Sequence, residues 1–180
     1  MSRIDDSRDF IPMRIAVLTV SDTRSAAEDR SGDALVERRV GGGHAPVARG
    51  LGRDERADTA ARLRAWIADP GVDAVLTTGG TGLTGRDVTV EAHRDVYEKE
   101  IEAFGTVFTI VSMQKIGTSA VQSRACGGVA GGTYLFALPG SPGACRDAWD
   151  EILKWQFDYR HRPCNFVEIL PRLDEHQRRK

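Results

Sequence analysis

Runs of apolar residues of strand length recur along this chain and are separated by segments with helical periodicity. The run at 14–20 is almost continuously apolar, which predicts a central strand covered on both faces. Similar runs predict buried strands at 73–78 and 134–138, and a weaker strand is expected at 45–51. This alternation of strand and helix is typical of an α/β fold with a parallel sheet.

The segments between the strands follow a helical repeat. The clearest example is 56–69, where apolar side chains recur on one side and Pro70-Gly71 ends the pattern. Ser141 and Pro142 suit the N-cap and the first turn of another helix, which we expect to reach about Tyr159. The remaining expected elements are helices at 31–40, 89–102, 105–115 and 117–124, and a hairpin formed by 127–132 and 133–138.

The length and the ends of the chain predict a single domain. With 180 residues, one domain can bury about two-thirds of its unfolded surface. The polar residues 1–12 are predicted to be a flexible segment, and 174–180 a charged tail. The folded domain is therefore expected over 13–173.

Charge and cysteine content argue against several classes of partner and site. A formal net charge of −1 gives no electrostatic basis for binding nucleic acid or an anionic membrane. Three widely spaced cysteines without a CxxC pair argue against disulfides and zinc and favour a reducing compartment. No signal peptide is visible, and no apolar run approaches the roughly 20 residues of a membrane span. We therefore expect a soluble cytoplasmic protein.

The most distinctive stretch follows the strand at 73–78. Residues 77–85 hold four glycines and four threonines, and Arg86 and Asp87 come next. Glycine lets the backbone approach a ligand closely, while threonine hydroxyls and exposed amides suit phosphate oxygens. The start of the following helix favours negative charge. The stretch predicts a phosphate site, with a ligand-free strand-to-helix connection as the alternative.

Polar residues also follow the other expected strands. They are Ser21-Asp22 after the first strand, Asp54 after the second and Pro139-Gly140-Ser141 after the last. In an open parallel sheet, ligands bind outside the carboxyl ends of the strands, so these groups and the 77–87 loop should share one edge. Taken one at a time, Asp54 has a cap of the 56–69 helix as its alternative, and Asp87 has the N-cap of the following helix.

The motifs that the sequence lacks exclude several kinds of catalytic and binding site. The sequence has no GxxxxGK[ST] loop, no GxGxxG after the first strand and no GxSxG elbow. Its four histidines lack the spacing of metal ligands, and His93 is most simply a packing or surface residue of a helix. The cysteines are interpreted as structural. Glycine loops and a few carboxylates remain, chiefly Asp54 and Asp87. That set suits Mg²⁺ and a nucleotide, because Mg²⁺ is usually held by one or two carboxylates together with substrate phosphates.

Several motifs, in order along the chain, resemble the MoaB/Mog family of molybdenum cofactor biosynthesis proteins. The resemblance runs from about Arg14 to Arg172, and RPCNF at 162–166 is more similar to the MoaB branch than to the Mog branch. The other motifs that carry it are TGGTGLTGRDVT at 78–89, AFG at 103–105, IGTSAVQSRACGGVAGGT at 116–133 and ALPGSPGAC at 137–145.

The resemblance implies a fold and an activity. The fold would be a three-layer α/β/α sandwich with a mostly parallel mixed sheet, one edge strand of which is antiparallel. The activity would be adenylylation of molybdopterin by Mg-ATP, with release of pyrophosphate. Asp54 and Asp87 match the acidic positions needed with Mg²⁺ and nucleotide.

The resemblance also assigns binding residues by position. Thr78, Gly79, Gly80, Thr81 and Gly82 match the phosphate loop, with Arg86 beside it. The other matched positions are Ser21 and Asp22 at the first strand end, Ser119, Ser123 and Arg124 near the pterin, and Pro139, Gly140 and Ser141 in the second ligand loop.

Two further expectations come with the family. Its members form trimers or hexamers, for which the apolar region 104–113 could supply an interface, and the product would pass to a molybdenum insertase. Some MoaB-type members lack the transferase activity and have altered acidic positions. Here Asp54 and Arg86-Asp87-Val88-Thr89 are intact, which favours the enzyme over a non-catalytic binder of pterin or nucleotide.

Overall fold

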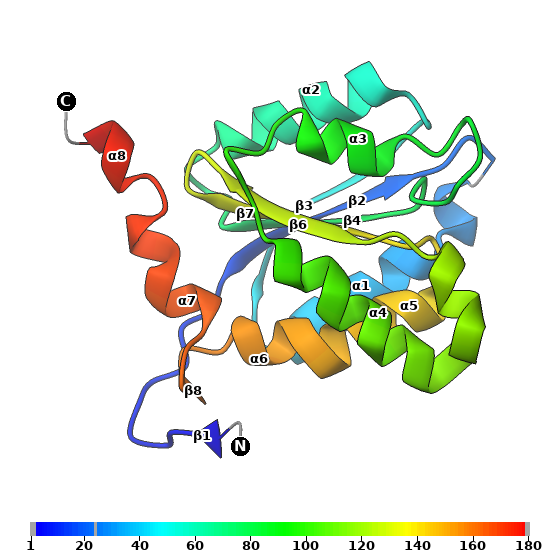
Figure 1. Cartoon of the computed structure of the whole chain (residues 1–180). Coiled ribbons are helices and arrows are strands. Elements are labelled where there is room, and N and C mark those ends of the chain that lie inside the picture. Colours follow the sequence, from blue (N-terminus) through cyan, green and yellow to red (C-terminus); the bar gives the residue numbers. More distant parts are fainter. Residues whose placement is uncertain (1–2, 24, 179–180) are drawn as a thin grey trace.

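A six-stranded sheet forms the centre of the computed structural model, which describes residues 3–23 and 25–178. The strand order is β3-β2-β4-β7-β6-β5 (Figure 1). The strands are β2 (Arg14–Val20), β3 (Ala45–Gly52), β4 (Ala74–Thr78), β5 (Lys99–Glu100), β6 (Cys126–Ala130) and β7 (Thr133–Leu138).

Four neighbouring strands of this sheet are parallel. β2 runs parallel to β3 and β4, and β4 runs parallel to β7. β6 is antiparallel to β7, and the two join through the predicted hairpin, whose turn residues Gly131 and Gly132 have φ of 55° and 88°. The antiparallel strand is not the edge strand that we expected, because the two-residue β5 pairs with its outer side.

Helices cover both faces of the sheet, which confirms the three-layer α/β/α sandwich (Figure 1). On one face lie α2 (Arg56–Ile67) and α3 (Thr89–Arg94). On the other lie α1 (Arg30–Gly41), α4 (Glu102–Ile116), α5 (Pro142–Ala148) and α6 (Lys154–Gln156). Short helical segments are η1 (Ala26–Glu28), η2 (Gly117–Gln122), α7 (Phe166–Ile169), η4 (Leu170–Arg172) and α8 (Glu175–Arg178).

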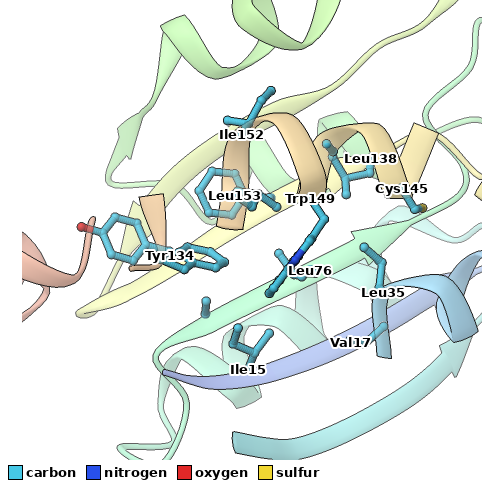
Figure 2. Close-up of a cluster of buried hydrophobic side chains, with 14 of the residues drawn as sticks. Ile15, Val17, Leu35, Leu76, Tyr134, Leu138, Cys145, Trp149, Ile152 and Leu153 are labelled. Carbon is cyan, nitrogen blue, oxygen red and sulfur yellow. The ribbon is translucent and has the colours of Figure 1, made fainter. Parts of the chain in front are cut away.

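Successive residues of β2 contribute to two separate hydrophobic cores, one on each face of the sheet. Ile15 and Val17 point into the larger core beneath α1 and α5, which also holds Leu35 and Trp149 (Figure 2). Ala16 and Leu18 belong to the smaller core on the α2 side. Because neighbouring side chains of a strand point to opposite faces, a continuously apolar strand is what a sheet covered on both sides requires.

The prediction of a single helix at 89–102 was wrong. α3 ends at Arg94, and the chain then runs along the outer side of β6 before α4 begins at Glu102. The backbone N–H groups of Glu98 and Ile101 donate to the carbonyls of Val129 and Gly127, at 2.9 and 2.7 Å. The edge of the sheet thus offers hydrogen bonds that replace those of a continuous helix.

The helix expected at 141–159 forms with one irregularity. Ser141 is its N-cap and accepts a hydrogen bond from the Ala144 N–H, with Pro142 in the first turn as predicted. The segment Trp149–Leu153 (η3) is a π-helical turn between α5 and α6. Trp149 and Leu153 are both buried there, so the turn lies against the larger core (Figure 2).

The described terminal residues contact the domain. β1 (Arg3–Ile4) pairs with β8 (His161–Arg162), and Arg8 donates to the Tyr159 carbonyl at 3.0 Å. The flexibility expected of 1–12 and 174–180 stays a prediction. Within residues 3–23 and 25–178, no helix is long and apolar enough to cross a membrane.

Candidate functional site

The loops that follow β2, β3, β4 and β7 meet at one edge of the sheet. The Ser21 N–H donates to the Gly52 carbonyl at 2.9 Å, which ties the first two loops together. The Gly79 N–H donates to the Leu138 carbonyl at 3.1 Å, which ties the other two. The common edge predicted from the order of strands and polar clusters is confirmed.

The glycine-rich loop packs closely against the end of β2. Gly79 and Gly80 have φ of 97° and 61°, a conformation that favours glycine. A Cβ on Gly79 would stand 2.1 Å from the Val20 carbonyl oxygen, so no side chain fits there. The loop, green at the right of Figure 1, leads from β4 to α3 with its backbone at the edge of the sheet.

Asp54 is not the cap of α2, because Glu55 occupies that position. Its Oδ2 accepts a hydrogen bond from the Asp22 N–H at 3.0 Å. Its Oδ1 is buried, and no residue in the described part of the chain donates a hydrogen bond to it. Burial raises the pKa of Asp54, and the negative charges of Asp22 and Asp87 act in the same direction.

Asp87 is likewise not the cap of α3, whose N-cap is Val88. Its Oδ2 accepts hydrogen bonds from the Thr84 hydroxyl at 2.7 Å and from the Thr84 N–H at 2.8 Å. The bond from the Thr84 hydroxyl is the main cause that lowers the pKa of Asp87. Asp87 is thus an ionised carboxylate on the same edge as Asp54, close enough to influence its titration.

Two arginines of the predicted site have different surroundings. Arg86 is 76% exposed and forms an ion pair with Asp22. Arg124 is partly buried: its Nε donates to the carbonyls of Thr81 and Gly82, at 2.9 and 3.0 Å. Its Nη1 donates to Glu91 Oε1 at 2.5 Å. Arg124 therefore holds the glycine-rich loop in place, with Glu91 as a partner that no pattern in the sequence indicated.

Thr78 and Ser141 hold the loop after β7. The Thr78 hydroxyl donates to the Pro139 carbonyl at 3.0 Å and lies 3.2 Å from the Cys145 sulfur. Gly140 lies between Pro139 and the helix cap Ser141 and is partly buried. These contacts shape the loop after β7, and the buried Cys145 packs behind it.

Ser119 and Ser123 lie apart from the four strand ends. Ser119 is exposed on η2, which follows α4 rather than a strand. Ser123 lines a shallow depression of about 350 Å³ together with Arg124 and Cys126. Arg124 connects this group to the glycine-rich loop through the carbonyls of Thr81 and Gly82.

A larger hollow adjoins the strand ends. It measures about 600 Å³ and is lined by Thr23, Glu28, Arg30, Ser31 and Pro142, among others. It lies between the loop after β2 and the start of α5, and has the size of a site for a small ligand.

The acidic residues at this edge fit a magnesium ion that is bound jointly with phosphate. In the described ranges, no three His, Cys, Asp or Glu side chains form a group that could hold a metal by itself. Mg²⁺ typically takes only one or two carboxylates and fills its other positions with water and substrate phosphates. Asp54, with a buried oxygen that lacks a donor, and the ionised Asp87 meet that requirement.

Known proteins resemble this chain in sequence. The family described as "Probable molybdopterin binding domain" matches residues 16–158. "Molybdenum cofactor biosynthesis protein B" of Escherichia coli (strain K12) is 48% identical over 160 residues, which are 89% of this chain and 94% of the relative.

Solved structures resemble it in fold. "Crystal structure of Molybdenum cofactor biosynthesis protein B" has a TM-score of 0.80 at 33% identity and covers 96% of this chain and 100% of its own. "Crystal structure of tungsten cofactor synthesizing protein MoaB from Pyrococcus furiosus" has a TM-score of 0.71, also at 33% identity, over 78% of this chain and 90% of its own.

Proposed function

This chain belongs to the molybdopterin-binding domain family of molybdenum cofactor biosynthesis proteins, and we propose that it adenylylates molybdopterin with Mg-ATP. The observation that carries the proposal is the meeting of Asp54, Asp87 and the glycine-rich loop at one edge of the sheet. The family membership supports molybdopterin as the acceptor of the adenylyl group. The two carboxylates and the glycine-rich loop support Mg-ATP as its donor.

In the proposed reaction, a phosphate oxygen of molybdopterin attacks the α-phosphorus of ATP. A new oxygen–phosphorus bond forms, the bond from the α-phosphorus to the bridging oxygen breaks, and pyrophosphate leaves with the bonding electrons. Phosphoryl transfer of this kind depends mainly on positioning and on charge stabilisation.

Each part of the site has a role in that scheme. The Gly80 N–H binds a phosphate oxygen, since glycine permits close approach. The Gly79 N–H already donates to the Leu138 carbonyl and the Gly82 N–H to Asp87, so these two glycines shape the loop. Asp54 and Asp87 would hold a magnesium ion together with the phosphates, and the ion would neutralise charge on the transferred group. Arg86, being exposed, adds positive charge at the mouth of the site.

Product formation tests the proposal. The purified protein is incubated with molybdopterin and Mg-ATP, and pyrophosphate and adenylylated pterin are measured. Asp87→Ala should abolish both products with an unchanged circular dichroism spectrum, because one ligand of the cation is lost. Asp9→Ala, at an exposed position in the N-terminal segment, is the matched control and should retain full activity. Full activity of the Asp87 variant would contradict the assignment.

The second candidate is a non-catalytic protein that holds the pterin or nucleotide for another enzyme. The RPCNF ending at 162–166, which is more similar to the MoaB branch, favours it. Such a protein binds molybdopterin but releases no pyrophosphate, so the same assay separates the two.

We also propose that the protein is a homo-oligomer, a trimer or hexamer, and that its product passes to a molybdenum insertase in the cytoplasm. The support for self-association is a set of exposed apolar side chains on one region of the surface, which soluble monomers rarely gather. They are Val107, Ile110, Met113 and Ile116 of α4 and Val121 of η2. Light scattering of wild type and of Ile110→Glu tests this: the variant should have the smaller mass.

A further inference from the structure

Two buried oxygens at the edge of the sheet lie next to Gly80. Asp54 Oδ1 and Thr89 Oγ1 are both buried, and neither has a hydrogen-bond partner among the residues that the structure describes. A Cβ on Gly80 would stand 2.5 Å from the first and 2.4 Å from the second. Both oxygens therefore border the position that a side chain at residue 80 would occupy.

The backbone fixes this arrangement. The Thr89 N–H donates to the Gly80 carbonyl at 2.9 Å, which joins the start of α3 to the glycine-rich loop. Gly80 has a φ of 61°, so the chain turns there in the conformation that favours glycine. Thr89 is fully buried and cannot turn its hydroxyl toward bulk water.

An unpaired buried hydroxyl is unfavourable, and so is an unpaired buried carboxylate oxygen. Together they make a donor set of two oxygens, one of them charged. Magnesium and manganese favour oxygen ligands, and a threonine or serine hydroxyl beside an aspartate is an established way to hold Mg²⁺ near a nucleotide.

We infer that Thr89 is a cation-positioning residue, whose hydroxyl ligates a divalent cation together with Asp54 Oδ1 in the space above Gly80. This inference rests on the proposed function, and it gives a separate role to Thr89, which the sequence indicated only as the last residue of the motif at 78–89. Asp87, whose carboxylate borders Gly82 in the neighbouring turn, would add negative charge near the cation, and phosphate oxygens of the nucleotide would supply further ligands.

Manganese binding tests the inference without requiring turnover. Mn²⁺ is titrated into the protein with α,β-methylene-ATP, and free Mn²⁺ is followed by electron paramagnetic resonance. Thr89→Val removes the hydroxyl and should weaken Mn²⁺ binding at least tenfold. That tenfold loss corresponds to about 1.4 kcal/mol of binding free energy. Thr89→Ser keeps the hydroxyl, and its Mn²⁺ affinity should stay within about twofold of wild type.

A matched control separates this effect from the loss of any buried hydroxyl. Thr133 is buried at the opposite edge of the sheet, where its hydroxyl donates to the Val72 carbonyl at 3.1 Å. Thr133→Val should lower thermal stability and leave Mn²⁺ affinity unchanged. Thr89→Val should not lower the stability of the cation-free protein, because its hydroxyl has no partner to lose. Wild-type Mn²⁺ affinity in Thr89→Val would overturn the inference.

A second measurement tests the position of the cation even if Thr89→Val does not fold. Crystals of the wild-type protein are soaked with Mn²⁺ and the analogue, and the anomalous signal locates the ion. A peak within about 2.5 Å of Thr89 Oγ1 and Asp54 Oδ1 supports the inference. A water molecule in that space, with manganese elsewhere, overturns it.

Failure of this inference differs from failure of the proposed function. If wild type forms adenylylated pterin while Thr89→Val binds Mn²⁺ normally, the role of Thr89 is wrong and the activity stands. If Mn²⁺ binding depends on Thr89 but no pyrophosphate is released, the cation site stands and the activity is wrong.

Discussion

Asp22 and Asp54 hold each other through reciprocal hydrogen bonds between side chain and backbone. Asp54 Oδ2 accepts from the Asp22 N–H at 3.0 Å, and Asp22 Oδ1 accepts from the Asp54 N–H at 3.2 Å. Arg86 pairs with the other oxygen of Asp22. The pair locks the loop after β2 to the loop after β3 and leaves Asp54 Oδ1 directed away from it, toward Gly80.

Asp22→Ala should therefore weaken binding of Mg-ATP without unfolding the protein. The Asp54 N–H loses its acceptor and Arg86 loses its ion pair, so Asp54 is held less firmly. Loss of one such bond is worth about 1–2 kcal/mol, which corresponds to a rise in KM of roughly 5- to 30-fold. Steady-state pyrophosphate release measures it. Asp22→Asn keeps the acceptor oxygen and should lie nearer to wild type; equal KM values in all three proteins would contradict the positioning role.

Asp54→Asn should stabilise the cation-free protein at pH 7 while abolishing activity. Because burial raises the pKa of Asp54 in the folded state, its contribution to stability is fully present below the unfolded pKa and is lost as the pH rises through the folded pKa. An uncharged side chain avoids that loss. Urea unfolding at pH 7 and in acid should show a gain at pH 7 that disappears in acid. Asp9→Asn should show neither effect, and a variant less stable than wild type at pH 7 would refute the expectation.

The Arg124–Glu91 pair should matter for stability as well as for the shape of the loop. Arg124 donates to three loop carbonyls, those of Thr81, Gly82 and Asp87, and to Glu91, and the side chain is partly buried. Hydrogen bonds to charged groups contribute about 1.5–3 kcal/mol, so Arg124→Ala should lower the free energy of unfolding by about that amount. Urea denaturation checks this value.

A double-mutant cycle with Glu91→Gln isolates the ion pair within that loss. Arg124→Lys is the informative control, because lysine keeps the charge but cannot reach the carbonyls and Glu91 with a planar group. It should recover only part of the stability. Full recovery would mean that charge alone, and not the forked geometry, holds the loop.

Stability should fall as the pH drops below about 6.5, because two buried histidines remain neutral in the folded protein. Burial lowers the pKa of His93 to about 3 and that of His44 to about 4. As the pH falls, the unfolded chain binds a proton at each histidine before the folded protein does. Each histidine therefore lowers the free energy of unfolding by about 1.4 kcal/mol per pH unit between its unfolded-state pKa and its folded-state pKa.

Urea unfolding between pH 4.5 and 7.5 measures this slope. His93→Gln should be less stable at pH 7.5, since His93 bonds Thr77 and Tyr97, and should have a shallower slope below pH 6.5. An unchanged slope in the His93 variant would show that other groups cause the acid sensitivity.

Sequence patterns by themselves determined the parallel strands of the sheet, its two covered faces and the edge where the predicted site residues gather. The apolar run at 14–20 required burial on both sides, and the polar residues after each parallel strand, such as Asp54, had to share one edge. These features depend on side-chain periodicity and strand direction, which neighbouring residues specify.

The tertiary structure decided what depends on contacts between distant segments. The helix expected at 89–102 gave way to β5 because the edge of β6 offered backbone partners to Glu98 and Ile101. Arg124 holds the loop because Glu91 and three loop carbonyls accept its hydrogen bonds. The hydroxyl of Thr89 gained a candidate role only because the turn at Gly80 placed it beside Asp54 Oδ1. Such partners lie tens of residues apart, and only the folded chain brings them within a few ångströms.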